Sequence, residues 1–276
     1  MTQVDLHVHS TYSDGTDTPT ELVLKAKDAG LSAFALTDHD TIEGIEEAVN
    51  AAKEYNIEVI PGVELSTEFD KKEVHMVGLF IDYKDGILKS ELERLQNTRL
   101  NRNRIMADRF KEHGINVDYD EMLTMYPDAV ITRAHFADYL LQKGYVGDRN
   151  EAFDRYLGDH CPCYVKREKM TPARAIELIK AAGGVPVLAH PVLYHLGKEQ
   201  MDKLVKHLCE CGLVALEAIY STYTLGDELE MRRLAKDNGL LISGGSDYHG
   251  GNKPHIKLGV GMGKLYVPSE VLEKLR

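Results

Sequence analysis

The sequence predicts an α/β fold, a barrel or sheet of mainly parallel strands interrupted by one helical insertion. Along most of the chain, short apolar segments typical of buried strands alternate with stretches of helical periodicity. Glycine, proline and small polar residues separate these segments. From about residue 82 to residue 170 the alternation stops, and helical periodicity dominates. These observations favour an α/β domain with an inserted helical subdomain.

Chain length and composition indicate an ordinary globular protein. The 276 residues are enough for one large domain, or for one domain with a sizeable insertion. The hydrophobic fraction of 43% and the charged fraction of 28% are typical of soluble proteins. No apolar run approaches the length that spans a bilayer, and the first residues lack the basic and apolar regions of a secretory signal. We therefore expect a cytoplasmic protein with no membrane contact.

Charge and cysteine content narrow the possible functions. The net charge of −11 argues against a broad surface that coats nucleic acid, although it allows a locally basic pocket. The four cysteines occur in two Cys-x-Cys pairs, at 161–163 and 209–211. This is not the usual spacing of a zinc ribbon, and a chain of this size needs no disulfides. We interpret the cysteines as structural or incidental thiols.

The first part of the α/β pattern covers residues 1–81. Thr18 and Glu21 form a capping box with Pro19 at the first helical position, which predicts a helix from here to about residue 29. The turn at 70–72 is short enough for a hairpin rather than a β-α-β unit. The other elements expected here are strands at 3–8, 32–36, 57–63 and 74–81 and a helix at 42–55.

The pattern resumes in residues 171–276, after the insertion at 82–170. Thr171 and Pro172 begin a helix that Gly183 ends. The elements expected after it are strands at 185–188, 214–219 and 240–243 and helices at 199–211 and 227–238. Within the insertion, helices are expected at 88–113, 133–143 and 150–157. The count is about seven strands.

The first dozen residues carry a chemical signal. His7 and His9 lie two residues apart at the end of the first strand, so their imidazoles point to one face. Asp14 follows in a Ser/Asp/Gly loop. Two imidazoles and a nearby carboxylate suit Zn²⁺, Mn²⁺ or Fe²⁺. Alone, this stretch is also compatible with two surface histidines that bind nothing.

Further histidines and carboxylates stand mostly where other expected strands end. The active sites of α/β barrels are built at the carboxyl ends of the strands, so we expect these side chains to meet there. With three or four protein ligands per ion, they would serve two or three ions. The nine candidate ligands are His7, His9, Asp14, His39, Glu64, His75, His190, Asp247 and His249.

The short motifs around these ligands are His7-Val8-His9, Thr37-Asp38-His39, Gly62-Val63-Glu64, Ala189-His190-Pro191 and Gly245-Ser246-Asp247-Tyr248-His249. Together they resemble the PHP (polymerase and histidinol phosphatase) superfamily. They extend over almost the whole chain, and the set is specific although each tripeptide alone is weak. The resemblance implies a distorted (β/α)7 TIM-like barrel, the PHP fold, with a trinuclear metal site.

The same resemblance implies how three divalent ions would share the ligands. Glu64 would bridge the first and the second ion. The implied sets are His7, His9, Glu64 and Asp247 for the first ion, Glu64, His75 and His190 for the second, and Asp14, His39 and His249 for the third. Mn²⁺, Fe²⁺ and Zn²⁺ are all compatible with these ligand types.

The insertion indicates a branch of the family. Residues 131–137, 143–146 and 163–165 are similar to the TrpH/YciV-like branch. Members of that branch are similar to phosphatases that remove the 3′-phosphate from nucleoside 3′,5′-bisphosphates, and some degrade short RNAs from the 5′ end. The resemblance therefore implies a nucleotide or a short RNA 5′ end as the substrate. No stable protein partner is expected.

Basic residues of the insertion fit a phosphate-rich ligand. Arg99 and Arg102 share a helix face with Arg109, and a guanidinium offers a planar fork to phosphate oxygens. Arg133 and His135 lie at the start of the next helix, where anions are favoured. The candidate substrate-binding residues are Arg99, Arg102, Arg133, His135 and Lys166, with Arg167 adding charge. An ordinary solvated basic helix is the alternative.

The expected reaction is metal-assisted hydrolysis of a phosphate ester. The catalytic candidates are Asp14, His190, Asp247 and His249, of which the last three could protonate the leaving ribose oxygen. One departure is Tyr223, where relatives often carry a histidine, and this could alter substrate preference. Three other readings stay open: a histidinol-phosphate or other small-molecule phosphatase, a polymerase-associated module, and a metal-stabilised nucleotide-binding protein without turnover.

Overall fold

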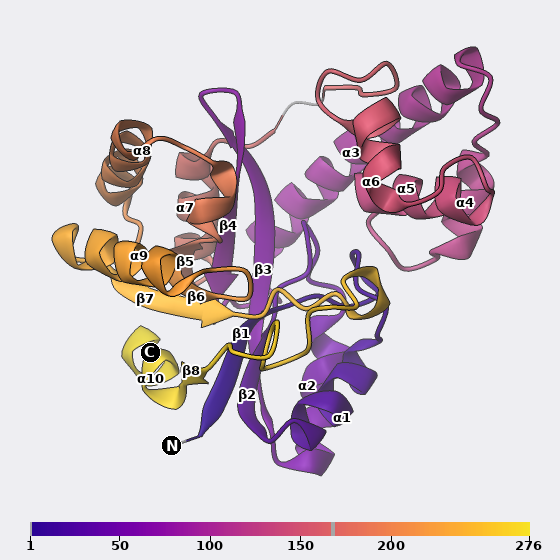
Figure 1. Cartoon of the computed structure of the whole chain (residues 1–276). Helices are drawn as coiled ribbons and strands as arrows, with labels where there is room; N and C mark the ends of the chain where they lie inside the picture. The colour runs from indigo at the N-terminus through magenta and orange to yellow at the C-terminus, as the bar shows by residue number, and fades with distance from the viewer. Residues whose placement is uncertain (1, 167–168) are drawn as a thin grey trace. The chain divides into compact units, whose positions relative to one another are not determined.

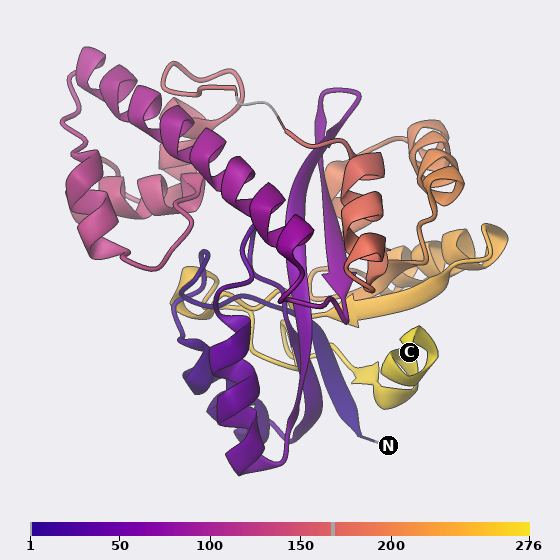
Figure 2. The same cartoon turned by 180° about the vertical axis from the view of Figure 1, so that it is seen from behind.

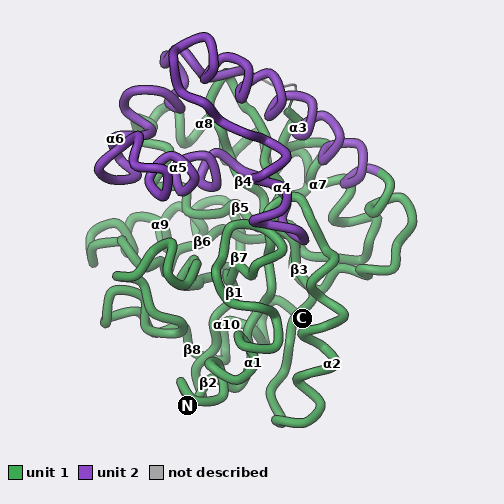
Figure 3. The backbone as a smooth tube through the Cα atoms, turned by 90° about the vertical axis from the view of Figure 1, so that its right-hand side faces the viewer, with its two compact units in different colours: residues 1–90, 169–276 green, residues 91–168 purple. Residues whose placement is uncertain are grey.

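A computed structural model describes residues 2–166 and 169–276 (Figure 1). The chain forms two compact units, coloured separately in Figure 3: Met1–Ser90 with Lys169–Arg276, and Glu91–Glu168. The first division falls inside helix α3 (Gly86–Glu112), nine residues beyond the expected bound at 82. The second lies two residues before the expected bound at 170. The role of the second unit in substrate recognition stays a prediction.

The first unit is built on a sheet that nearly closes into a barrel. The strand order is β7-β6-β5-β4-β3-β2-β1-β8. The two sides of the remaining gap are joined where Asp247 N donates to His7 O (2.9 Å) and His9 N donates to Tyr248 O (3.0 Å). The expected α/β barrel is confirmed. The strands are β1 (Gln3–Val8), β2 (Leu31–Leu36), β3 (Glu58–Phe69), β4 (Lys72–Leu79), β5 (Val185–Leu188), β6 (Ala215–Tyr220), β7 (Leu241–Gly245) and β8 (Val267–Pro268).

Strand β4 distorts the barrel because it runs antiparallel to both of its neighbours. The hairpin expected between β3 and β4 is thereby confirmed. Strand β3 is longer than the expected 57–63 because its pairing with β4 continues to Phe69, opposite Lys72. The reversal places the beginning of β4 beside the carboxyl ends of the parallel strands. His75 therefore reaches the same end of the barrel as Glu64.

Helices of the first unit cover the outside of the barrel, with α1 and α2 on one side and α7 to α9 on the other (Figures 1 and 2). The capping box of Thr18 and Glu21 is present at the start of α1. Among the described residues, no helix is both long and apolar enough to cross a membrane. The helices are α1 (Pro19–Asp28), α2 (Ile45–Tyr55), α7 (Pro172–Ala181), α8 (Lys198–Cys211), α9 (Leu225–Asp237), α10 (Ser269–Leu275) and the short 3-10 turns Pro191–Tyr194 and Gly250–Asn252.

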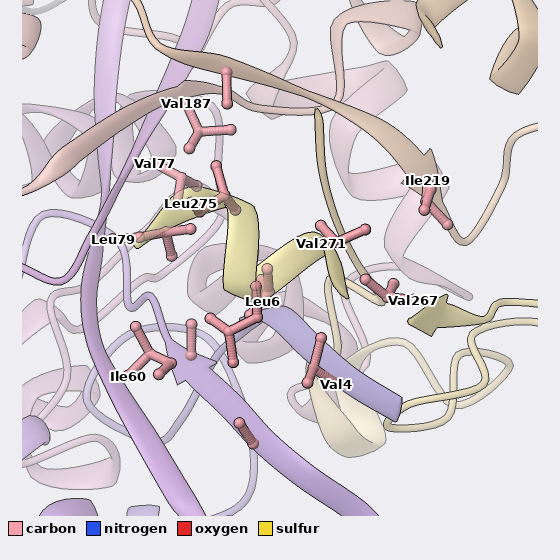
Figure 4. Close-up of a cluster of buried hydrophobic side chains, with 14 of the residues drawn as sticks. Val4, Leu6, Ile60, Val77, Leu79, Val187, Ile219, Val267, Val271 and Leu275 are labelled. Carbon is pink, nitrogen blue, oxygen red and sulfur yellow. The ribbon is translucent and has the colours of Figure 1, made fainter. Parts of the chain in front are cut away.

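Apolar side chains fill the barrel at the end where the parallel strands begin. Val4 and Leu6 of β1 pack with Val187 of β5 and with Val271 and Leu275 of α10 (Figure 4). All five are buried. Burial of apolar surface is the main favourable contribution to folding. Helix α10 and strand β8 were not expected from the sequence, because both are too short to show a clear period. With this end filled, the polar residues that follow Leu6 lie toward the opposite end.

The second unit is helical and has its own core. Phe136 stacks between Phe110 (6.0 Å between ring centroids) and Tyr119 (6.1 Å). The expected helix at 150–157 is a short α-helix followed by a π-helical turn. Helix α4 was not expected, because it has only seven residues. Besides most of α3, the elements are α4 (Tyr119–Met125), α5 (Arg133–Gln142), α6 (Arg149–Ala152) and the π-helical turn Phe153–Leu157.

We expect Gly245→Ala to destabilise the barrel closure. A Cβ at Gly245 would lie 2.5 Å from both the backbone nitrogen and the Cβ of His7, and β1 cannot withdraw without opening its contact with the segment after β7. Overpacking of this kind lowers the free energy of unfolding by about 1–3 kcal/mol. Denaturant unfolding of the metal-free protein, followed by circular dichroism, measures the change.

Gly86→Ala is the matched control, because a Cβ there meets no atom within 4 Å. Its free energy of unfolding should stay within about 0.5 kcal/mol of the parent. Equal stability of the two variants would contradict the close approach of Gly245 to His7.

Candidate metal centre

The nine side chains expected as ligands lie together at one end of the barrel. They come from β1 and the loop after it, from β3 and β4, and from the segments that follow β2, β5 and β7. Their ligand atoms form four overlapping groups, and within a group all atoms lie within 4.8 Å of one another. The groups are His9, Asp14, His39 and His249; His7, Glu64 and His190; His7, His9 and Asp247; and His39, Glu64 and His75.

Glu64 is the central carboxylate of this cluster. Its Oε1 lies 2.8 Å from His75 Nδ1 and 2.9 Å from His190 Nε2. Its Oε2 lies 3.1 Å from His39 Nδ1 and 3.2 Å from His7 Nε2. Glu64 is completely buried. Because its two oxygens face different imidazoles, Glu64 has the geometry to bridge two cations.

The other two carboxylates stand on either side. Asp247 Oδ1 lies 3.2 Å from His9 Nε2. Asp14 Oδ1 lies 3.1 Å from His249 Nε2, and its Oδ2 lies 3.8 Å from His39 Nε2. Each carboxylate therefore belongs to a different part of the cluster, as separate ions would require.

Two of the cluster residues have left-handed backbone conformations that non-glycine residues rarely adopt. The φ angle is 27° at His190, directly after β5 and Ala189, and 55° at Asp247, just after β7. Such conformations cost about 1–3 kcal/mol each and persist only where the surroundings enforce them. Here the backbone N–H of His190 donates to Glu217 (2.6 Å), and that of Asp247 donates to the carbonyl of His7.

Glu217 supports two of the imidazole-bearing residues. Its Oε1 lies 2.8 Å from His7 Nδ1, while its Oε2 accepts the His190 backbone N–H. A proton on His7 Nδ1 leaves Nε2 of the same ring to face the centre, an arrangement common in metal sites. Our sequence reasoning missed Glu217 because it considered only strand ends. A single glutamate inside the apolar strand β6 was the signal that could have found it.

Further polar side chains fix the ligands from outside. Asp247 Oδ2 accepts hydrogen bonds from the Tyr220 hydroxyl (2.5 Å) and from Lys253 Nζ (2.6 Å), so Oδ1 is left to face the centre. His249 Nδ1 lies 2.9 Å from the Asp247 carbonyl oxygen, which directs Nε2 toward Asp14. None of these partners was expected from the sequence.

The loop that carries Asp14 is held by Asp38. The Asp38 carboxylate accepts hydrogen bonds from the Ser10 backbone N–H (2.7 Å), the Ser10 hydroxyl (2.6 Å) and the Ser13 hydroxyl (2.6 Å). Asp38 stands in the Thr37-Asp38-His39 motif, but the sequence alone assigned it no role. Its contacts explain why an aspartate precedes His39.

The surroundings of the cluster favour the ionised form of Glu64, whereas the pKa shifts of its histidines differ in direction from one ring to the next. Burial disfavours the charged form of Glu64, yet the surrounding imidazoles hold its pKa well below the usual range. Burial would lower the pKa of His75, but Glu64 raises it to about 10. In the same way, the nearby carboxylates of Asp247 (3.2 Å) and Glu64 (3.3 Å) raise the pKa of His9 to about 9. Burial dominates at His39 and lowers its pKa to about 3.

The donor set fits divalent cations. Within the described part of the chain, the buried atoms without a hydrogen-bond partner include His7 Nε2, His9 Nε2, His39 Nδ1, Asp14 Oδ1 and Glu64 Oε2. Buried polar atoms are nearly always satisfied, so five such atoms in one cluster indicate a missing positive partner. Imidazole nitrogens and carboxylate oxygens are the ligands of zinc, manganese and iron.

The five residues expected to bind substrate all lie in the second unit. Arg99 and Arg102 are buried on α3, and Lys166 is exposed. Arg133 forms an ion pair with Asp159 (2.9 Å), and His135 Nδ1 accepts the Thr132 backbone N–H in a capping box at the start of α5. Arg167 lies outside the described residues. Contact of these residues with a substrate stays a prediction.

Tyr223, the expected departure from relatives, is partly buried. Its hydroxyl accepts the Val192 backbone N–H (3.2 Å), and its ring lies against that of Tyr220 (5.1 Å between centroids). Tyr223 thus packs next to a residue that hydrogen-bonds Asp247. An effect on substrate preference stays a prediction.

A family model described as "PHP domain" matches residues 5–171, more than half of the chain. The chain belongs to the PHP domain family. The family resemblance stated from the motifs is thereby confirmed.

Relatives of this PHP domain protein include named enzymes. This chain is 40% identical over 245 residues to a 5′-3′ exoribonuclease of Haemophilus influenzae, and the match covers 89% of each chain. It is 34% identical over 250 residues to a 3′,5′-nucleoside bisphosphate phosphatase of Chromobacterium violaceum, covering 90% of this chain and 88% of the relative.

A solved structure supports the same assignment. A Bifidobacterium adolescentis protein assigned as a metal-dependent phosphoesterase superposes with a TM-score of 0.88 at 28% identity, covering 99% of this chain and 95% of the other. The expected enzyme class, a metal-dependent phosphoesterase, is confirmed by these relatives together. Divalent metal as the cofactor agrees with the clustered ligands.

We expect Glu217→Gln to weaken metal binding without unfolding the protein. The change keeps the size of the side chain but removes the charge that faces His7. Loss of such an outer partner typically costs 10- to 100-fold in metal affinity, and we expect a decrease of about that size for Mn²⁺. Competition with a chelating dye measures the affinity. Glu230→Gln, at an exposed position of α9, is the control and should bind Mn²⁺ like the parent.

We expect the apparent Mn²⁺ affinity to rise with pH between 6 and 9. Since the pKa is about 9 at His9 and about 10 at His75, these rings hold protons in the metal-free protein, and ligation must displace them. Raising the pH removes the competing protons. A titration with Mn²⁺ in weak buffer should therefore release protons, as read by a pH indicator. Affinity that is constant over this range would contradict the assignment of these rings as ligands.

Proposed function

We propose that this PHP domain protein hydrolyses the 3′-phosphate ester of nucleoside 3′,5′-bisphosphates. Adenosine 3′,5′-bisphosphate and water would give AMP and phosphate. We include short 5′-phosphorylated RNAs, degraded from the 5′ end, as a second substrate of the same site. The observation that carries the proposal is the convergence of nine metal-ligand side chains around Glu64. The relatives named for these two reactions support the choice of ester.

The proposed cofactor is a set of three divalent ions, Mn²⁺, Fe²⁺ or Zn²⁺. The overlapping groups around the two oxygens of Glu64, and the separate group around Asp14, support more than one ion. Bound divalent ions act as Lewis acids toward phosphoryl oxygens and lower the pKa of a bound water. The proposed ligand sets are His7, His9, Glu64 and Asp247; Glu64, His75 and His190; and Asp14, His39 and His249.

The protein's own contribution is to hold these ligands in place before substrate arrives. Glu217 fixes the His7 ring, Asp38 fixes the loop of Asp14, and Tyr220 fixes Asp247. Such preorganisation avoids reorganisation during the reaction, which is the main source of electrostatic catalysis. We assign the proton for the leaving 3′-oxygen to the ligand set itself, where His190, His249 and Asp247 are the candidates.

The second unit is proposed to select the substrate. Arg99 and Arg102 lie three residues apart on α3, and Arg133 lies at the start of α5. We propose that these guanidinium groups, with His135 and Lys166, bind the 5′-phosphate and so orient the 3′-ester for hydrolysis. Arg99 and Arg102 are both buried, which does not favour the alternative of an ordinary solvated helix for these two residues.

A substrate panel tests the proposed function. Mn²⁺-loaded protein is incubated with adenosine 3′,5′-bisphosphate, histidinol phosphate and a 5′-phosphorylated oligoribonucleotide, and released phosphate and nucleotides are measured. We expect hydrolysis of the first and the third. Preference for histidinol phosphate, or no turnover of any ester by metal-loaded protein, would overturn the proposal.

Asp14→Ala should reduce turnover on the order of 10³-fold in the same assay. Asp14 offers its oxygens to His249 and His39, so its removal takes a carboxylate from the third ligand set. The fold should change little, because Asp14 lies in a loop. Asp202→Ala, on the exposed face of α8, is the control and should keep parental turnover. Unfolding of Asp14→Ala, or full activity, would count against the assignment.

A further inference from the structure

Lys253 reaches the metal centre from the loop after β7. Its Nζ lies 2.6 Å from Asp247 Oδ2. Among the described lysines and arginines, it is the one that forms an ion pair with a member of the nine-residue cluster. The Lys253 side chain is 35% exposed, whereas that of Asp247 is 5% exposed. The lysine side chain therefore extends from solvent to the cluster.

The backbone around Lys253 is fastened to the loop that carries Asp14. Gly251 N–H donates to the Thr16 hydroxyl (2.8 Å), and the Asn252 side-chain amide donates to the Asp14 carbonyl (2.7 Å). The Lys253 N–H itself donates to Gly250 O (3.2 Å). These bonds hold the base of the side chain beside the cluster, so its position is a built feature of the fold.

Electrostatics favours another anion for Lys253 once metal is bound. A divalent ion held by Asp247 would offset the charge of the carboxylate and would repel a neighbouring ammonium. Asp247 Oδ2 still has the Tyr220 hydroxyl as a donor. A four-carbon stem with a point charge suits a phosphate group, and the transferred phosphoryl group carries its charge on its outer oxygens.

We infer that Lys253 binds the substrate phosphate that is cleaved, donating a hydrogen bond from Nζ to a non-bridging oxygen. The inference rests on the proposed function and adds a residue outside the metal-ligand set. Lys253 is then a catalytic residue, since it touches the reacting group. Binding of the product, inorganic phosphate, must depend on the same contact.

The test compares Lys253→Met, Lys253→Gln and Lys253→Arg with the parent, each loaded with Mn²⁺. Three quantities are measured: metal content by elemental analysis, affinity for inorganic phosphate by calorimetry, and kcat/KM with adenosine 3′,5′-bisphosphate. We expect unchanged metal content, phosphate affinity at least about 10-fold weaker in the Met and Gln variants, and kcat/KM lower on the order of 10²-fold. The arginine variant should recover part of both losses.

Lys203→Met is the matched control, because it removes a lysine from an ion pair with Asp70 (2.8 Å) outside the cluster. It should match the parent in all three measurements. Parental phosphate affinity in Lys253→Met, loss of metal together with phosphate affinity, or no phosphate binding by the parent overturns the inference. A parent that binds phosphate but hydrolyses none of the esters refutes the proposed function, and the phosphate arm still decides the role of Lys253.

Discussion

One buried carboxylate governs the arrangement of this protein. Glu64 presents one oxygen to His75 and His190 and the other to His7, His9 and His39. A fully buried carboxylate is stable only with compensating positive charge, and the facing imidazoles hold its pKa far below the usual range. The strands that supply those rings must therefore bring them to one end of the barrel. The barrel closure, the reversed strand β4 and the strained residues after β5 and β7 satisfy that requirement.

The polar groups behind the ligands determine how well the centre is formed. Glu217 connects β6 to two ligand-bearing segments, and Asp38 connects the end of β2 to the first loop. These groups are buried and hydrogen-bonded, so they add order without exposing charge to the apolar core. Apolar packing occupies the other end of the barrel, around Val4, Leu6 and α10. One end of the barrel thus holds the apolar packing and the other end holds the candidate metal ligands. This separation is general in parallel α/β barrels.

Local patterns predicted much of this architecture. The capping box at Thr18, the alternation in β1 and the histidines at strand ends are short-range signals, and the structure bears out the convergence that they implied. Residues whose role depends on tertiary contacts gave weaker signals in the sequence. Glu217 lies 210 residues along the chain from His7, so nothing local identifies its partner. Helix α10 is too short to show a period, and its burial depends on strands that are distant in the sequence.

The antiparallel direction of β4 determines where the inserted residues leave and rejoin the barrel. The chain leaves the barrel near Asp82, whose N–H donates to Ala182 at the finish of α7, and re-enters at Met170, which pairs with Thr67 near the far end of β3. Leu79 at the end of β4 nevertheless lies opposite Val185 at the start of β5, because these two strands are antiparallel neighbours. Neighbouring antiparallel strands can be joined by a short hairpin. The pairing of β4 with β5 therefore needs no long connection, and residues 91–168 are an addition that the barrel itself does not require.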